Sequence, residues 1–394
     1  MNFPLLTKDL AGELRLRLEK VTEMMKRDGV DTLIAASTTN ILYLTGGICR
    51  GYFYISTHRD PIFFILPPAE SDNPLCRVIH KPELITGILE SESYPAPQML
   101  ALESDDLLYS DFTRLRKIFP AASLANGSKI LREARMIKTP YEIKMMRTDG
   151  MHQCEVYSRV KHCYREGMSD VEFQIEIERV MRLEGCLGYL RVAGSKMELN
   201  MGSLLAGENA DVPSPYDFAL GGAGVDPSLP AGASGIILRN GMTVMIDMNG
   251  GFNGYQTDMT RCWSVGDVPE TVKHAHNCSR AILRDLEKFA LPGVEIGALY
   301  RRTEEMVKAE GLEKYFMGFS HKVKFIGHGV GIELNEIPVV MERNRMPLQE
   351  GMTIALEPKF VIPPYGAAGV ENTYLVTDHG LENLTPFPEE LKQL

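Results

Sequence analysis

Cysteine is scarce in this sequence and follows no recognisable pattern. The chain has 394 residues and seven cysteines, and no two of them form a Cys-x-x-Cys pair. This spacing excludes a zinc knuckle, and an odd number of scattered cysteines argues against a disulfide framework. We therefore expect reduced thiols, as in a cytoplasmic protein.

Excess positive charge and long apolar runs are also missing. The formal net charge is −10, which disfavours nucleic acid or an anionic membrane surface as a partner. No apolar run approaches the length of a membrane span, and the first residues lack the basic and apolar regions of a signal peptide. The hydrophobic fraction of 44% and the charged fraction of 24% are ordinary for a globular protein. We expect a soluble, cytoplasmic protein with neither a membrane nor a nucleic acid as partner.

The order of helix and strand signals predicts two domains. A helix capped by Thr7 and ended by Gly29 precedes buried strands at 32–36 and 61–66, which together indicate an α/β domain over residues 1–125. The turn-forming pair Asn126-Gly127 lies at the predicted boundary. Residues 126–394 then form a second, larger domain.

Capping boxes mark two helix starts in the second domain. Residues 139–142 read Thr-Pro-Tyr-Glu, so that a threonine caps the helix, a proline occupies its first turn and a glutamate completes the box. Residues 169–172 read Ser-Asp-Val-Glu and predict a second helix of the same kind, which ends at Gly185.

A long loop and two more helices follow. Residues 188–235 are rich in Gly, Pro and Ser, and a loop of this length in a compact domain is more often functional than idle, so we expect it near the site. Amphipathic helices are expected at about 269–290 and 295–310. His274 and His276 are two residues apart on the first of these helices and do not share a face; we expect both at the surface.

The stretch around Asp247 predicts a hairpin that carries two aspartates. The apolar run 243–246 ends in Asp247, and the Gly- and Asn-rich turn 249–254 leads to a second extended segment with Asp258. If the turn is symmetric about Phe252-Asn253, the two aspartates face each other with Cβ atoms about 5 Å apart. Like charges in this position repel, which indicates a cation between them.

A second hairpin repeats this arrangement with glutamates. An apolar run ends in Glu357, the loop 363–366 reverses the chain, and Glu371 follows in the returning segment. A turn centred on Pro364 places the two glutamates opposite each other. Two hairpins that each deliver a carboxylate pair are hard to explain as a surface feature.

Four buried acids need compensating positive charge. Each could pair with a basic side chain, such as Arg261 or Lys359, and for any single acid that alternative is about as good as a metal. For all four together, two divalent cations explain the pattern better. His328, in a Gly-His-Gly context that lets the backbone approach closely, is the candidate nitrogen ligand, although such a histidine alone is more often a turn residue. Mn, Co, Fe or Zn suits this ligand set.

These residues resemble those of the pita-bread metalloenzymes: methionine aminopeptidase, aminopeptidase P, prolidase and creatinase. The motif Asp247-x-Asn-Gly-Gly-x-x-Gly-Tyr-x-x-Asp258-x-Thr-Arg matches the aspartate motif of the family. Gly327-His328-Gly-x-Gly matches its histidine motif, and Glu357-Pro and Val-Glu371-Asn-Thr match its glutamate motifs. The first domain, with Asn40-Ile-Leu-Tyr-Leu-Thr-Gly46, resembles the N-terminal domain of the prolidase and creatinase branch.

The resemblance implies an α+β fold: a C-terminal pita-bread domain with a smaller creatinase-like N-terminal α/β domain. It also implies a cytoplasmic homodimer that acts as an Xaa-Pro dipeptidase or aminopeptidase on a small peptide. The implied cofactors are two divalent metal ions, Mn first and Co, Zn or Fe as alternatives. The implied metal ligands are Asp247, Asp258, His328, Glu357 and Glu371.

The implied mechanism uses a hydroxide bridging two ions about 3.5 Å apart. Asp258 and Glu371 bridge the ions, Asp247 lies on one of them, and His328 and Glu357 lie on the other. Glu357 and His328 are the predicted catalytic residues, Glu357 as the group that takes the proton of the water. Thr260, on the same strand face as Asp258, is expected to orient it from behind.

The chain also departs from the peptidase pattern. No histidine occurs between Cys163 and Lys273, although the family places a substrate-binding histidine near Pro230. The peptidases carry a histidine at the position of Lys324 and a His-Glu pair at the position of Asn335-Glu336. They often carry an arginine at the position of Gly369. His321 or Lys324 could compensate. These changes motivate an alternative: a metal-dependent hydrolase or lyase of a non-peptide amide or C–N compound. A non-catalytic binding protein is a third reading, disfavoured by the retained ligands.

Overall fold

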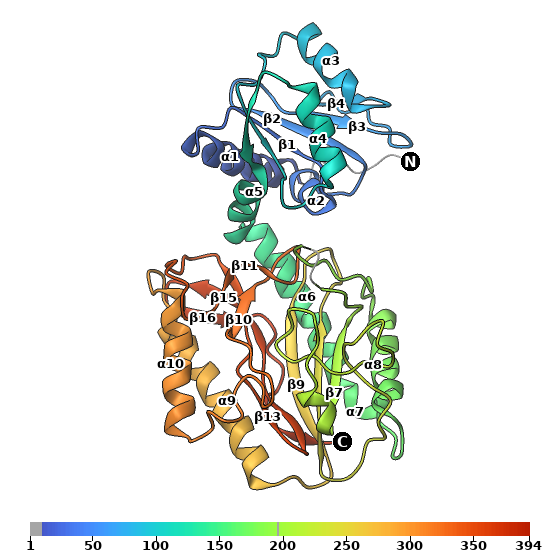
Figure 1. The fold of residues 1–394 in the computed structure, drawn as a ribbon, viewed down its shortest axis with the longest axis vertical. Coiled ribbons are helices and arrows are strands. Elements are labelled where there is room, and N and C mark those ends of the chain that lie inside the picture. Colours follow the sequence, from blue (N-terminus) through green and yellow to red (C-terminus); the bar gives the residue numbers. More distant parts are fainter. Residues whose placement is uncertain (1–9, 195–196) are drawn as a thin grey trace. The chain divides into compact units, whose positions relative to one another are not determined.

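The chain divides into two compact units. The computed structural model describes residues 10–194 and 197–394, and the units comprise residues 1–135 and 136–394 (Figure 1). The division expected after residue 125 falls in strand β6 (Ser123–Asn126), and helix α5 (Gly127–Met136) spans the observed division. Each unit is described by itself below.

The first unit is built on a six-stranded mixed sheet in the order β4-β3-β2-β1-β5-β6. Strand β1 pairs antiparallel with β2 and parallel with β5. The strands are β1 (Thr32–Ala35), β2 (Gly51–Ser56), β3 (Ile62–Ile65), β4 (Cys76–Val78), β5 (Met99–Leu102) and β6. The helices are α1 (Ala11–Arg27), α2 (Thr38–Thr45), α3 (Ile85–Ser91), α4 (Tyr109–Ile118) and α5, with a 3₁₀ turn at Pro82–Leu84. The predicted first helix and both predicted strands are present, whereas the predicted cap Thr7 lies outside the described residues.

The second unit holds two sheets and a ribbon between two groups of helices. A four-stranded sheet has the order β17-β9-β8-β7, a five-stranded sheet the order β11-β10-β12-β15-β16, and β13 and β14 form the ribbon. The strands are β7 (Gly202–Ala206), β8 (Met242–Asn249), β9 (Asp258–Val265), β10 (Gly327–Gly329), β11 (Glu336–Val339), β12 (Thr353–Leu356), β13 (Lys359–Ile362), β14 (Gly366–Gly369), β15 (Asn372–Thr377), β16 (Gly380–Asn383) and β17 (Lys392–Gln393). The helices are α6 (Pro140–Ser158), α7 (Val160–Cys163), α8 (Asp170–Glu184), α9 (Glu270–Phe289) and α10 (Ile296–Ala309), with a 3₁₀ turn at Gly207–Asp211.

Each group of helices encloses its own apolar core. Helices α6 to α8 pack with β7, β8 and β9 around residues such as Phe173, Ile246 and Trp263. Helices α9 and α10 pack with the strands β12 to β15 around residues such as Ile282 and Phe360. The strands therefore lie between the two helix groups in Figure 1, and the acid-bearing strands come from both sides.

The predicted helix starts of this unit are confirmed. Thr139 and Ser169 cap α6 and α8 through complete capping boxes, and Gly185 ends α8 in the left-handed conformation. The prediction that His276 lies at the surface is wrong. Its side chain is buried and its Nε2 donates to the Glu389 carbonyl at 2.7 Å, because the C-terminal segment covers this part of α9.

The register of the first hairpin differs from the prediction, whereas that of the second agrees with it. Asp247 faces Thr260 and Asn249 faces Asp258, so the aspartates are not directly opposite each other. The turn centres on Asn253-Gly254, because the loop is pinned to α6: Phe252 N donates to the Asp149 carboxylate and the Asn253 side chain to the Met145 carbonyl.

In the second hairpin, Lys359 pairs with Gly369 and Leu356 with Asn372, which is the register centred on Pro364. All seven cysteines are free, as predicted. Among the described residues, no helix has the length and apolarity needed to cross a bilayer.

Candidate metal centre

Hydrogen bonds between the two hairpins bring their acids together. The Thr373 hydroxyl accepts from Asp258 N at 2.7 Å and donates to the Asp258 carbonyl at 2.9 Å. Glu371 N donates to the Thr260 carbonyl at 3.2 Å. Strand β9 and the segment before β15 are thereby fixed side by side, which places Asp258 and Glu371 at one point.

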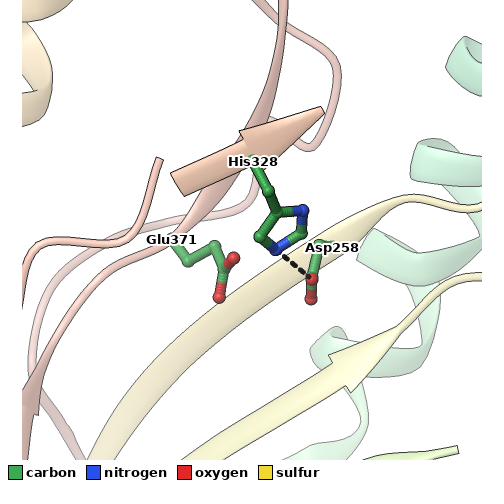
Figure 2. Close-up of side chains that lie close together, drawn as sticks. All are labelled: Asp258, His328 and Glu371. Atoms are coloured by element: carbon green, nitrogen blue, oxygen red, sulfur yellow. Dashed lines mark ion pairs between the residues drawn. The ribbon is translucent and has the colours of Figure 1, made fainter. Parts of the chain in front are cut away.

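Asp258, His328 and Glu371 form the cluster best suited to a metal ion. Each offers one ligand atom, and these atoms lie within 4.8 Å of one another. The three side chains point toward one another from β9, β10 and the start of β15 (Figure 2). His328 Nε2 lies 3.6 Å from Asp258 Oδ2 and 3.8 Å from Glu357 Oε1. Both distances exceed a hydrogen bond and leave space for a shared cation.

Neighbouring groups orient these ligands. His328 Nδ1 lies 3.1 Å from the Gly329 carbonyl, which selects the tautomer that leaves Nε2 free to bind a metal. The Thr260 hydroxyl donates to Glu371 Oε2 at 2.6 Å. Thr260 was expected to orient Asp258, but in the structure its hydroxyl bonds to the carboxylate of Glu371 instead. Carboxylate and imidazole ligands of metals are commonly held in this way.

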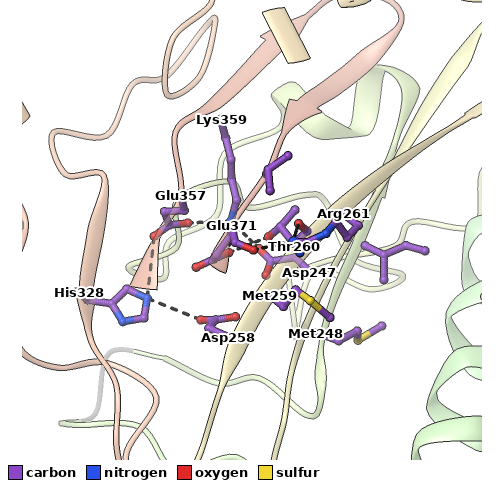
Figure 3. Close-up of polar contacts among 12 residues, drawn as sticks. Asp247, Met248, Asp258, Met259, Thr260, Arg261, His328, Glu357, Lys359 and Glu371 are labelled. Atoms are coloured by element: carbon purple, nitrogen blue, oxygen red, sulfur yellow. Dashed lines mark hydrogen bonds and ion pairs between the residues drawn. The ribbon is translucent and has the colours of Figure 1, made fainter. Parts of the chain in front are cut away.

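Lys359 lies among the remaining carboxylates. Its Nζ donates to Asp247 Oδ2 at 2.8 Å, Glu357 Oε2 at 2.7 Å and Glu371 Oε2 at 2.9 Å (Figure 3). Asp247, Glu357 and Glu371 thus each have one oxygen on this ammonium, and the expectation that Asp247 and Glu357 bind metal stays a prediction. Glu357 keeps its other oxygen toward His328. Arg261, the other basic candidate, donates to backbone carbonyls and to the Asn372 side chain.

The residues present fit one divalent ion. Glu371 Oε1 is buried without a hydrogen-bond partner among the described residues, and buried carboxylate oxygens are rarely left so. An ion held by Asp258, His328 and Glu371 would satisfy it. The Lys359 ammonium lies between Asp247 and the two glutamates.

The electrostatics agree with a site that is short of positive charge. Burial, and then the neighbouring Glu371 and Asp247, raise the pKa of Asp258 well above its usual value. Burial and the adjacent Glu357 raise the pKa of Glu371 to about 8. Burial alone would lower the pKa of Lys359, but the three carboxylates around it raise that pKa well above its usual value, so the amine is charged. One ammonium does not balance four acids, and a bound cation would favour the ionised forms of Asp258 and Glu371.

The cluster faces a cavity of about 430 Å³, a size typical of small-ligand sites. Part of its lining comes from the segment 188–235, which was expected to lie near the site. The segment is not a continuous loop as expected, because it contains β7 and the 3₁₀ turn Gly207–Asp211. The lining residues are Met197, Leu199, Gly202, Ser203, Asp217, Phe218, Ala219, Leu220, Asp247, Asn249, Asp258, Phe325, His328, Leu334, Asn335, Val339, Met341, Arg343, Glu357 and Glu371. Neither His321 nor Lys324 is among them, and His321 lines a separate cavity.

The sequence named Lys359 as a possible partner of the acids, and its position beside Glu357 has a simple reason. Residues two apart in an extended segment share a face, so Lys359 follows Glu357 onto the same side. Arg343 and Asp217 on the cavity wall carried no such signal, because they lie in loops whose course the sequence pattern does not define.

Fold and site together define a metallohydrolase centre carried by a pita-bread unit. Comparison with known proteins gives the family: residues 144–378 match the model of metallopeptidase family M24, and residues 17–137 match the Creatinase/Prolidase N-terminal domain. The chain therefore belongs to metallopeptidase family M24. The predicted family, the two-part α+β fold and the assignment as a metallopeptidase are confirmed.

Full-length relatives agree with this assignment. An Xaa-Pro dipeptidase of Pyrococcus furiosus is 25% identical over 390 residues, which cover 96% of this chain and 100% of the relative. An uncharacterized peptidase of Bacillus subtilis is also 25% identical, with 95% of this chain and 99% of the relative covered. Among solved structures, the prolidase of Pyrococcus horikoshii has a TM-score of 0.76 at 23% identity, covering 95% of this chain and 99% of that one. The Xaa-Pro dipeptidase of Bacillus anthracis reaches 0.79 at 21% identity, with 97% and 100% covered.

Proposed function

We propose that this chain is a metal-dependent hydrolase that cleaves the amide bond of a small substrate, with short Xaa-Pro peptides as the first candidates. The observation that carries the proposal is the convergence of Asp258, His328 and Glu371 on a cavity large enough for a dipeptide. Relatives that match the chain over nearly its whole length are named Xaa-Pro dipeptidases, which supports this substrate class.

The residues of the site divide the work of amide hydrolysis. Asp258, His328 and Glu371 would hold a divalent ion, which when bound would supply Lewis-acid chemistry for the scissile carbonyl and for activation of water. Glu357 directs one oxygen toward His328, from where it can take the proton of the attacking water and return it to the leaving nitrogen. Thr260 fixes Glu371, and Lys359 holds the other oxygen of Glu357.

The identity of the ion and the assembly of the chain are also part of the proposal. Manganese is proposed first, with cobalt, zinc or iron as alternatives, because carboxylate and imidazole ligands suit all four. Two ions are expected from the sequence, and the cluster of Asp258, His328 and Glu371 is the proposed site of one of them. A cytoplasmic homodimer is retained from the family resemblance, and light scattering of the purified chain tests the oligomer.

A second candidate is a non-peptide amide. Of the described residues that line the cavity, His328 is the only histidine, so the histidines with which family peptidases hold a peptide are replaced. Arg343 and Asn335 line the wall instead. This lining favours a compact substrate that carries an acidic or amide group.

Hydrolysis assays distinguish the two candidates. The chain is stripped with a chelator, reloaded with Mn²⁺, Co²⁺ or Zn²⁺, and tested on Xaa-Pro dipeptides, longer Xaa-Pro peptides, and a set of N-acyl and cyclic amides. Metal-dependent release of proline supports the peptidase. Turnover of the amides alone supports the second candidate. Absence of metal-dependent hydrolysis on both sets overturns the proposal, and the His328→Ala variant controls for contaminating peptidases.

A further inference from the structure

Lys359 occupies a position in which a metal ion would otherwise be expected. Its side chain is 0% exposed, and its ammonium lies 2.7 to 2.9 Å from one oxygen each of Asp247, Glu357 and Glu371 (Figure 3). Three charged acceptors around one nitrogen use all three ammonium hydrogens. The carboxylates are arranged around this nitrogen as ligands are arranged around a cation.

The backbone of the ribbon is closely packed beside Lys359. Lys359 pairs with Gly369 across the β13–β14 ribbon. A Cβ at position 369 would lie 2.9 Å from the Pro358 carbonyl oxygen, 3.0 Å from Lys359 Cα and 3.4 Å from its Cγ. Gly369 also has a φ of 152°, which side chains rarely adopt. Glycine at 369 is therefore required by the close approach of the backbone at Pro358 and Lys359.

We propose that the Lys359 ammonium takes the place of one of the two metal ions, so that the chain holds a single divalent ion at Asp258, His328 and Glu371. The inference rests on the metal centre of the proposed function and specifies its composition. An ion placed among Asp247, Glu357 and Glu371 would lie against the ammonium, and two cations at such a distance repel strongly in a buried site. The orphaned Glu371 Oε1 leaves the other position open to one ion.

The charge of the site is consistent with one ion. Four carboxylates against one ammonium leave three formal negative charges, and one divalent ion reduces these to one. A second divalent ion beside the ammonium would reverse the sign of the site. The buried ammonium also keeps one oxygen of Glu357 in place, which leaves the other oxygen for proton transfer.

Metal stoichiometry tests the inference without any assay of activity. The full chain is saturated with Mn²⁺, freed of excess metal, and analysed for bound metal and for its electron paramagnetic resonance spectrum. We expect one Mn²⁺ per chain with the spectrum of an isolated ion. We expect Lys359→Ala to bind a second Mn²⁺ and to give the spectrum of a coupled pair.

A buried lysine elsewhere provides the matched control. Lys138 Nζ lies 2.9 Å from Glu336 Oε2, and its side chain is 1% exposed. Lys138→Ala removes a buried, paired ammonium away from the cluster and should leave the stoichiometry unchanged. If Lys359→Ala does not fold, anomalous diffraction from Mn²⁺-soaked crystals of the unaltered chain decides the matter by one peak or two.

Each outcome bears on the inference. Two Mn²⁺ ions or none on the unaltered chain overturn it, and so does a Lys359→Ala variant that folds yet stays at one ion. The proposed function fails separately: one ion without amide hydrolysis sinks the function and leaves the inference standing. Two ions together with Xaa-Pro hydrolysis would overturn the inference and leave the proposed function standing.

Discussion

The hairpin β8–β9 contributes Asp258 to the site without a cation of its own, whereas the ribbon β13–β14 carries the ammonium of Lys359 between the two glutamates that flank it. The basic residue of the first hairpin, Arg261, donates instead to the carbonyls of Thr260 and Glu371. Two acid-bearing hairpins that look alike in sequence thus differ in charge balance. The first hairpin leaves Asp258 for a metal ion. The ammonium of the second hairpin contacts its own Glu357 and Glu371 and also Asp247 of the first.

The helices that support the two hairpins also differ. The turn of β8–β9 rests on Asp149 of α6, whose pKa is raised to about 7 by burial. The second hairpin rests on α9, where Ser279 accepts from Val370 N. There, burial lowers the pKa of His276 to about 4. The fold thus favours the protonated form of Asp149 and the unprotonated form of His276. A rise of the pH toward 7 therefore weakens the first support, and a fall of the pH toward 4 weakens the second.

The largest effect is expected where the two hairpins share an ion. His328→Ala removes the only nitrogen ligand of the cluster and should lower metal-dependent hydrolysis by at least ~10³-fold, since the ion contributes several kcal/mol to catalysis. Metal content after gel filtration and kcat/KM on the best substrate measure it. His274→Ala, on the exposed face of α9, is the control. Retention of metal and activity in His328→Ala would remove His328 from the site.

Arg261 and Lys359 should respond in opposite ways when their charge is removed. The Arg261 guanidinium, 2% exposed, donates to several carbonyls, among them those of Thr385 and Phe387. Arg261→Met leaves these acceptors unsatisfied and should cost about 3 kcal/mol of unfolding free energy while the metal stoichiometry stays unchanged. Urea unfolding and metal analysis measure both, with the exposed Arg147→Met as control. A changed stoichiometry would show that Arg261 also acts on the site.

Arg261 and Lys359 illustrate which features of the site can be predicted from the sequence and which cannot. Strand ends, capping boxes, the second register and the metal-ligand types follow from local pattern. The first register does not, because Asp149 and Met145, a hundred residues away, pin its turn. Lys359 is predictable as a residue on the face of Glu357, but its choice among several acids depends on how the hairpins pack together. His276 was misplaced because the C-terminal segment covers it.

A smaller effect is expected from the hydroxyl that links the hairpins. Thr260→Val removes the 2.6 Å hydrogen bond to Glu371 and keeps the shape of the side chain. We expect metal affinity to fall by about 10- to 100-fold, as for other groups that orient a ligand. Titration with Mn²⁺ measures it. Thr303→Val, a buried threonine bonded to its own helix, should bind metal normally. Equal affinities for the Thr260 variant and the unaltered chain would contradict an orienting role.

The smallest effect concerns the support beneath the second hairpin. The pKa of His276, about 4 in the fold, lies below the usual value near 6.5 of an unfolded histidine. The unfolded chain therefore takes up a proton that the folded chain does not bind, and stability is lost as the pH falls from 6.5 toward 4.

His276→Gln retains a donor for the Glu389 carbonyl but removes this proton uptake. Between pH 7 and pH 5.5 it should lose less stability than the unaltered chain, by about 1 kcal/mol. Urea unfolding at the two pH values measures the difference, and His274→Gln on the exposed face should behave like the unaltered chain. If all three proteins lost the same unfolding free energy between pH 7 and pH 5.5, His276 would not be the source of the acid sensitivity.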